Sequence, residues 1–144
     1  AERRATAIWE GSLTGGHGTI STQSGVLKNS PVTWASRVEA PEGKTSPEEL
    51  LAAAQAECYA MVLAHLLGQQ GKTPERIDVS ATATVEQQSG GLKITEMYLQ
   101  AEAQVQGMNQ NDFQQLAEEG ERSCPISNAL RGNVKSIVKA QLHT

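Results

Sequence analysis

Residues 46–68, SPEELLAAAQAECYAMVLAHLLG, decide the fold of this chain. Ser46 can cap a helix, Pro47 suits the first helical position, and Glu49 can complete a capping box. No Gly or Pro then interrupts the run before Gly68. We therefore predict one long central helix. Its expected packed face consists of the residues that recur at three- and four-residue spacing: Leu51, Ala54, Cys58, Met61, Val62 and His65.

Segments typical of β-strands lie on both sides of this helix. They alternate or are rich in β-branched residues, and Gly, Asn and Pro separate them. The last two meet at Ser89-Gly90-Gly91, which predicts a β-hairpin. The predicted strands are residues 5–10, 18–24, 32–38, 77–87 and 92–104.

The last third of the chain predicts two helices and a closing strand. Asn109 or Asn111 can cap a polar helix, which Cys124-Pro125 interrupts before a short helix through Leu130. Residues 133–142 then read as a strand. The order βββα-ββ-ααβ predicts a single α+β domain over residues 1–144, with antiparallel sheets around the long helix, and not a parallel doubly wound fold.

Composition limits the classes of partner. The 144 residues carry 16 acidic and 12 basic side chains, a net charge of −4, so we expect no nucleic-acid and no membrane partner. The apolar run 60–67 is too short to span a bilayer, and the first residues, AERRATAIWEG, lack the apolar core of a signal peptide. We expect a soluble, cytoplasmic protein. In that compartment two cysteines favour a redox role over a permanent disulfide.

Other site motifs are weak or absent. Gly43-Lys44-Thr45 lacks the first glycine of a phosphate-binding loop, and no G-x-S-x-G occurs. His17, His65 and His143 are scattered and no C-x-x-C is present, so we predict no metal and no cofactor.

The two cysteines differ in setting. Cys58 lies on the expected packed face, where a cysteine can serve only as a small apolar side chain of the core without any chemical role. Cys124 follows Arg122 and precedes Pro125 at the start of a predicted helix, where exposed N–H groups and the helix dipole favour a thiolate. Their spacing alone does not show whether the fold brings them together.

The motifs around both cysteines resemble the OsmC/Ohr family, the osmotically inducible and organic hydroperoxide resistance proteins. TSPEELLAAAQAECYAM (residues 45–61) resembles the family's central-helix signature, and SCPIS (residues 123–127) resembles its second-cysteine motif. AIWEG and SRVEA match the OsmC branch. The resemblance spans almost the whole chain.

This resemblance implies a cofactor-free thiol peroxidase that reduces organic hydroperoxides. Cys58 would be the peroxidatic thiolate and Cys124 the resolving thiol, and an external dithiol would reopen their disulfide. Arg37 would stabilise the thiolate and bind the peroxide oxygens, and Glu48 would hold the Arg37 guanidinium by a bidentate pair. Alternatives to Arg37 are Arg3, Arg4 and Arg122.

The family also forms intertwined homodimers, which bears on a geometric difficulty. Glu48 and Cys58 are ten residues apart, roughly 15 Å along a straight helix. Arg37 must bridge them, the first helical turn must unwind, or a second chain must contribute. We therefore expect an obligate homodimer.

Glu57 directly precedes Cys58, where the family commonly has a small residue. An inward carboxylate would raise the pKa of Cys58, but about 100° of helix rotation separates neighbouring residues, so we expect Glu57 to point away. We expect Met61, Val62 and Tyr59 to line an apolar site. Two other hypotheses remain: a redox-sensing or binding module of the same fold without efficient turnover, and a structural protein with inert cysteines.

Overall fold

The computed structural model describes residues 1–143 and divides the chain into two compact units, Ala1–Leu50 and a second unit that begins at Leu51. The first unit contains an antiparallel sheet of order β1-β2-β3 and a short helix α1, and the helix α2 starts within it. The bounds are β1 Ala5–Glu10, β2 His17–Thr22, β3 Ser30–Val32, α1 Trp34–Val38 and α2 Pro47–Gln69.

The predicted strand at 32–38 is wrong beyond its first residue. Residues 34–38 form α1, although Val and Trp are typical of strands. A local capping box overrides that preference. The Thr33 side chain accepts from the Ser36 N–H at 3.1 Å, and the Ser36 hydroxyl accepts from the Thr33 N–H at 2.9 Å.

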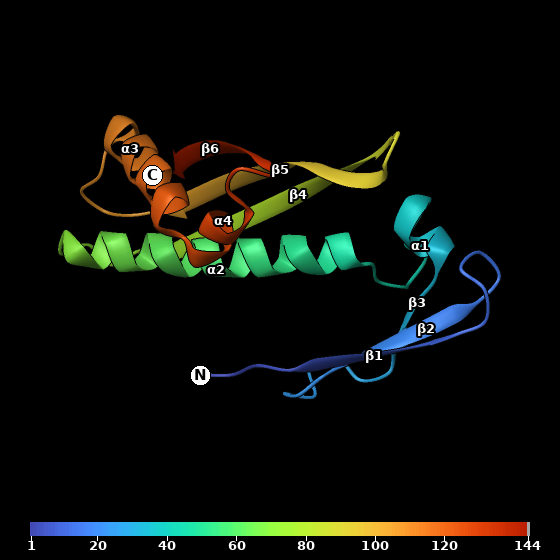
Figure 1. The fold of residues 1–144 in the computed structure, drawn as a ribbon. Coiled ribbons are helices and arrows are strands. Elements are labelled where there is room, and N and C mark those ends of the chain that lie inside the picture. The colour runs from blue at the N-terminus through green and yellow to red at the C-terminus, as the bar shows by residue number, and fades with distance from the viewer. Residues whose placement is uncertain (144) are drawn as a thin grey trace. The chain divides into compact units, whose positions relative to one another are not determined.

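The second unit is a three-stranded sheet of order β4-β5-β6 with helices packed on it (Figure 1). The predicted hairpin is confirmed, since β4 and β5 pair antiparallel around the turn at Ser89-Gly90. Asn109 caps α3, and Pro125 begins α4, as predicted. The bounds are β4 Arg76–Gln88, β5 Gly91–Gln104, α3 Gln110–Ser123, α4 Pro125–Leu130 and β6 Lys135–His143.

The expectation of purely antiparallel sheets is wrong for the closing strand. β6 pairs parallel with β5, from Glu96↔Lys135 to Gln104↔His143. The α3–α4 segment returns the chain from the end of β5 to a point opposite Glu96. A crossover of that length is what a parallel pair requires.

The core of the second unit lies between α2 and the sheet. Alternate residues of β5 from Met97 to Ala103 are buried in one cluster with α2 residues, and α3 adds Phe113, Leu116 and Ala117. Gly120 of α3 allows close packing on α2, because a Cβ there would lie 2.9 Å from Leu63 Cδ2. The buried residues of β5 and of the part of α2 in the second unit are Gln55, Tyr59, Leu63, Leu66, Leu67, Met97, Leu99, Ala101 and Ala103.

The predicted packed face of α2 is therefore displaced. Met61 is 66% exposed and His65 is exposed, whereas Tyr59 and Leu63 are fully buried. Ala and Leu residues of α2 occur on all sides of the helix, so the spacing of apolar residues alone does not identify which face is buried. Of the helices in residues 1–143, α2 is the one whose length and composition suit a bilayer span, a test that a core helix also passes.

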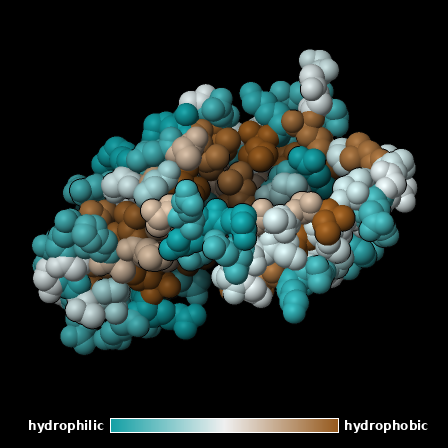
Figure 2. Space-filling view, turned by 60° about the horizontal axis from the view of Figure 1, so that its bottom comes forward, coloured by the Kyte–Doolittle hydropathy of each residue, from teal (hydrophilic) through white to brown (hydrophobic). Residues whose placement is uncertain are grey.

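Large apolar side chains reach the surface in both units, and hydrophobic areas are plain in Figure 2. All of β1 is exposed, with Ile8 at 62% and Trp9 at 41%. Among the described residues of the second unit, the large apolar side chain that is exposed is Met61. The residues of the first unit bury almost no apolar side chain among themselves.

Candidate active site

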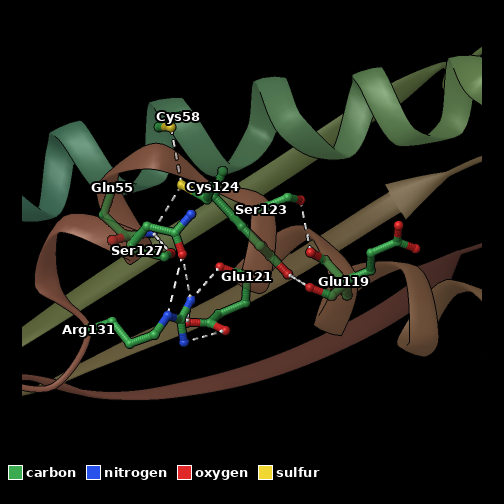
Figure 3. Close-up of polar contacts among 11 residues, drawn as sticks. Gln55, Cys58, Glu119, Glu121, Ser123, Cys124, Ser127 and Arg131 are labelled. Carbon is green, nitrogen blue, oxygen red and sulfur yellow. Dashed lines mark hydrogen bonds and ion pairs between the residues drawn. The ribbon is translucent and has the colours of Figure 1, made fainter.

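Cys58 of α2 and Cys124 between α3 and α4 face each other in the second unit (Figure 3). Their Sγ atoms are 3.1 Å apart and hydrogen-bonded, and both thiols are free. Cys58 is half-buried, whereas Cys124 has no exposed surface. The fold thus brings together two cysteines 66 residues apart in sequence, close enough to form a disulfide after a small movement.

Local sequence fixes Cys124 at this junction. Its N–H donates to the Gly120 carbonyl at 2.9 Å as the C-cap of α3, and its carbonyl accepts from the Asn128 N–H at 2.9 Å in α4. Pro125 lacks an N–H and cannot continue α3, but it suits the first position of α4. The break between the helices therefore holds the Cys124 thiol towards α2.

A buried polar pair lies behind Cys124. The Gln55 Nε2 donates to the Ser127 Oγ at 2.8 Å and approaches the Cys124 Sγ at 3.6 Å. Gln55 is 1% exposed and Ser127 is 5% exposed, so both side chains of the pair are buried. Farther out, Arg131 forms an ion pair with Glu121 at 3.1 Å beside a cavity of about 160 Å³ (Figure 3).

The two thiols have opposite electrostatic settings. Burial raises the pKa of Cys58 and so do the neighbouring Cys124 and Glu57, although the Ile126 N–H opposes them. Burial also acts to raise the pKa of Cys124. Hydrogen bonds from the Ser127 N–H, Cys58, the Ser127 hydroxyl and the Ile126 N–H outweigh burial and lower that pKa below its ordinary value. Within the second unit alone, the negative charge is thus favoured on Cys124.

Cys58 lies in the wall of an open groove of about 500 Å³. Met61 and Val62 line it as predicted, but Tyr59 does not, because it is buried in the core with its hydroxyl donating to the Ala117 carbonyl. Glu57 lies at the same groove, and its charge raises the pKa of Cys58, so the expectation that it points away is wrong. The other lining residues are Ala54, His65, Pro125 and Ile126.

In the first unit, Arg37 of α1 and Glu48 of α2 form the expected bidentate ion pair. The Arg37 Nε donates to Glu48 Oε1 at 3.0 Å, and Nη2 donates to Oε2 at 3.1 Å. The Arg37 guanidinium also lies 5.9 Å from the centre of the Trp34 ring. α2 is helical from Pro47 onward, so the alternative in which its first turn unwinds is wrong.

Gln55 and Ser127 were not singled out by the sequence. Ser127 is the last residue of the SCPIS motif, and Gln55 is the one uncharged polar residue in the apolar run before Cys58. A polar side chain three residues before a cysteine on a helix shares its face, which is the signal that points to Gln55. In residues 1–143, no three His, Cys, Asp or Glu side chains lie together as a metal site would require.

Comparisons with known proteins place this chain in a family. The family model described as OsmC-like protein matches residues 40–139. Peroxiredoxin OsmC of Escherichia coli (strain K12) is 36% identical over 132 residues, 92% of each chain. An organic hydroperoxide resistance protein of Xanthomonas axonopodis pv. citri (strain 306) is 31% identical over 91 residues, 62% of each chain.

Solved structures agree with this assignment. The organic hydroperoxide resistance protein OsmC of Legionella pneumophila has a TM-score of 0.69 at 27% identity, covering 100% of this chain and 99% of that one. The fold is also that of the organic hydroperoxide resistance protein OhrB of Bacillus subtilis, with a TM-score of 0.71 at 24% identity over 95% of this chain and 97% of that one. The chain therefore belongs to the OsmC-like protein family.

Proposed function

We propose that this protein is a thiol-dependent peroxidase that reduces organic hydroperoxides to alcohols. The observation that carries the proposal is the 3.1 Å approach of the Cys58 and Cys124 sulfurs beside an apolar groove. Relatives named peroxiredoxin and organic hydroperoxide resistance protein support it. The groove residues Met61 and Val62 favour an alkyl or lipid hydroperoxide over hydrogen peroxide.

The reaction needs three steps. The Cys58 thiolate attacks the terminal peroxide oxygen, the O–O bond breaks, and the alkoxide leaves as the alcohol after protonation. Cys58 is then a sulfenic acid. The Cys124 thiolate attacks its sulfur and expels hydroxide, which forms the Cys58–Cys124 disulfide. An external dithiol supplies the two electrons that restore both thiols.

The first step requires a cation near Cys58. Because its pKa is raised within the second unit, a neutral thiol prevails there at neutral pH unless a positive charge approaches. We propose that the Arg37 guanidinium, oriented by Glu48, supplies that charge and donates hydrogen bonds to the peroxide. The proposal allows this Arg37 to belong to the same chain as Cys58 or to a partner chain.

We also propose that the protein is a homodimer. In an apolar stretch of 18 residues within α2, 28% of the residues are buried. Ile8 and Trp9 of β1 are exposed. A three-stranded sheet with almost no apolar core of its own is not expected to be stable without a cover. Sedimentation velocity at micromolar concentration is expected to give a dimer, and a folded, active monomer would contradict this.

The decisive experiment is a single-turnover titration of the reduced protein with cumene hydroperoxide. We expect loss of both thiols per chain, about one equivalent of peroxide consumed, and a mass decrease of about 2 Da from the new disulfide. Thiols unchanged in excess peroxide would overturn the proposal and favour a structural role. Oxidation followed by slow reduction with every dithiol tried would instead indicate a redox sensor.

A further inference from the structure

We propose that the external dithiol opens the Cys58–Cys124 disulfide by attacking the Cys58 sulfur, and that Cys124 leaves as a thiolate held by Gln55 and Ser127. This inference rests on the proposed redox cycle and adds a direction to its last step. It assigns Gln55 as a positioning residue for the leaving sulfur. Three observations carry it: access to each sulfur, the line of attack, and the hydrogen bonds around Cys124.

Access separates the two sulfurs. Cys58 lies in the wall of the open groove beside Met61 and Val62, whereas Cys124 has no exposed surface. Which sulfur of a disulfide reacts depends strongly on whether a thiolate can reach it. Groove access therefore favours Cys58.

The line of attack gives the same answer. A thiolate must approach a disulfide sulfur from the side opposite the sulfur that leaves. For attack on Cys124, that side holds the buried Gln55 and Ser127, and Figure 3 shows Cys124 between Cys58 and the Gln55 amide. For attack on Cys58, the nucleophile must come from the side away from Cys124, and Cys58 lies in the wall of the open groove, with no such buried polar pair lining it.

The hydrogen bonds stabilise a negative Cys124. The Gln55 Nε2 donates to the Ser127 Oγ at 2.8 Å, which leaves the Ser127 hydroxyl proton free for the Cys124 sulfur, and the same Nε2 lies 3.6 Å from that sulfur. The N–H groups of Ser127 and Ile126 also contact Cys124 and help to lower its pKa. A disulfide breaks faster when the departing thiol has the lower pKa.

The step balances with a dithiol as the only reductant. One thiolate of the reductant forms a bond to the Cys58 sulfur while the Cys58–Cys124 bond breaks, and both bonding electrons leave with Cys124. The second thiol of the reductant, once deprotonated, attacks its own partner sulfur in the mixed disulfide. Cys58 is released as a thiolate, and the reductant leaves as a cyclic disulfide.

The test traps the mixed disulfide with 2-mercaptoethanol, a monothiol that has no second thiol in the same molecule to release Cys58. The protein disulfide is formed with diamide, so the test does not depend on peroxidase activity. After a short reaction, acid quenching and N-ethylmaleimide, trypsin is expected to release Cys58 in residues 45–72 and Cys124 in residues 123–131. We expect the monothiol on residues 45–72 and maleimide on residues 123–131, and the reverse pattern would overturn the inference.

A matched pair of variants tests Gln55. Gln55→Met keeps similar volume but removes the donor, and Gln69→Met makes the same change on the exposed end of α2. We expect reduction of the disulfide by dithiothreitol to slow about tenfold in Gln55→Met alone, since a hydrogen bond to a charged group is lost. Alkylation of reduced Cys124 should also shift to higher pH. Equal reduction rates in the two variants and the natural chain would overturn the role of Gln55.

The outcomes separate this inference from the proposed peroxidase. A Cys58 adduct in a protein that ignores cumene hydroperoxide would leave the attack direction standing and overturn the peroxidase. A Cys124 adduct in a protein with full turnover would overturn the attack direction and leave the peroxidase standing.

Discussion

Arg37 and Glu48, eleven residues apart, form a two-pronged ion pair in which the Glu48 side chain is 7% exposed and the Arg37 side chain is 34% exposed. The planar guanidinium occupies both carboxylate oxygens, which fixes its orientation. A lysine keeps the charge but not this fork. We therefore expect Arg37→Lys to slow cumene hydroperoxide consumption about tenfold, equivalent to roughly 1.4 kcal/mol of transition-state stabilisation.

The control for this variant is Arg76→Lys. Arg76 pairs with Asp78 at 3.0 Å, but both side chains are largely exposed, so its replacement should leave the rate unchanged. Equal rates for the two lysine variants in stopped-flow measurements would show that the orientation of Arg37 does not matter for the chemistry.

Replacing each cysteine in turn should separate the two oxidative steps. Cys124→Ser leaves Cys58 able to react with the peroxide but removes its disulfide partner 3.1 Å away. We expect one equivalent of peroxide to convert Cys58 to a sulfenic acid that dimedone traps, as intact mass will show. Cys58→Ser should consume no peroxide. Peroxide consumption by Cys58→Ser at the rate of the natural chain would reverse the two assigned roles.

Glu57 should set the pH dependence of the first step. The pKa of Cys58 is raised by burial and further by Cys124 and Glu57, so the reactive thiolate fraction grows as pH rises towards that pKa. Glu57→Gln removes one of the charges that disfavour the thiolate. We expect the pH–rate profile to move to lower pH and the rate at pH 7 to increase about twofold, the size typical of an exposed charge.

Glu86→Gln on β4 is the control for charge removal far from the groove, since Glu86 is likewise exposed. It should leave the profile in place. A Glu57→Gln profile that coincides with the control would mean that solvent screens Glu57 from Cys58.

Local signals in the sequence predicted most of the elements. Ser46 caps α2, since its Oγ accepts from the Glu49 N–H at 3.1 Å, but Glu49 completes no capping box and instead accepts from the Thr45 hydroxyl at 2.9 Å. The β4–β5 hairpin and the break between α3 and α4 lie at the positions that Ser89-Gly90-Gly91 and Pro125 predicted. These features depend on neighbouring residues, which a sequence displays directly.

Features that depend on distant contacts were not predictable in the same way. The parallel pairing of β6 depends on where α3 and α4 deliver the chain, and the buried face of α2 depends on which elements cover it. Gln55 is an example at the site, because it becomes significant only when Ser127, 72 residues later, lies 2.8 Å from it. The cysteine motifs could be recognised in the sequence. The polar groups that shift the pKa values of the two cysteines could be identified only from the fold.

Because Gly120 of α3 packs closely on α2, we expect alanine at Gly120 and alanine at Gly68 to change the free energy of unfolding in opposite directions. A Cβ at Gly120 would meet Leu63 Cδ2 at 2.9 Å and Tyr59 Cε1 at 3.3 Å, and both of these side chains are fully buried in the core. We expect Gly120→Ala to lower the free energy of unfolding by about 1–3 kcal/mol, the usual cost of overpacking. Urea titration at one fixed protein concentration measures this, since the stability of the proposed dimer would depend on concentration.

Gly68 provides the matched control in the last turns of α2. It has open space around it and ordinary helical backbone, so Gly68→Ala should raise the free energy of unfolding by up to about 1 kcal/mol through helix propensity alone. The two substitutions add the same methyl group, so their difference isolates packing from propensity. If Gly120→Ala were as stable as Gly68→Ala, α3 would have room to move away from Leu63, and close α2–α3 packing would not hold the Cys124 junction in place.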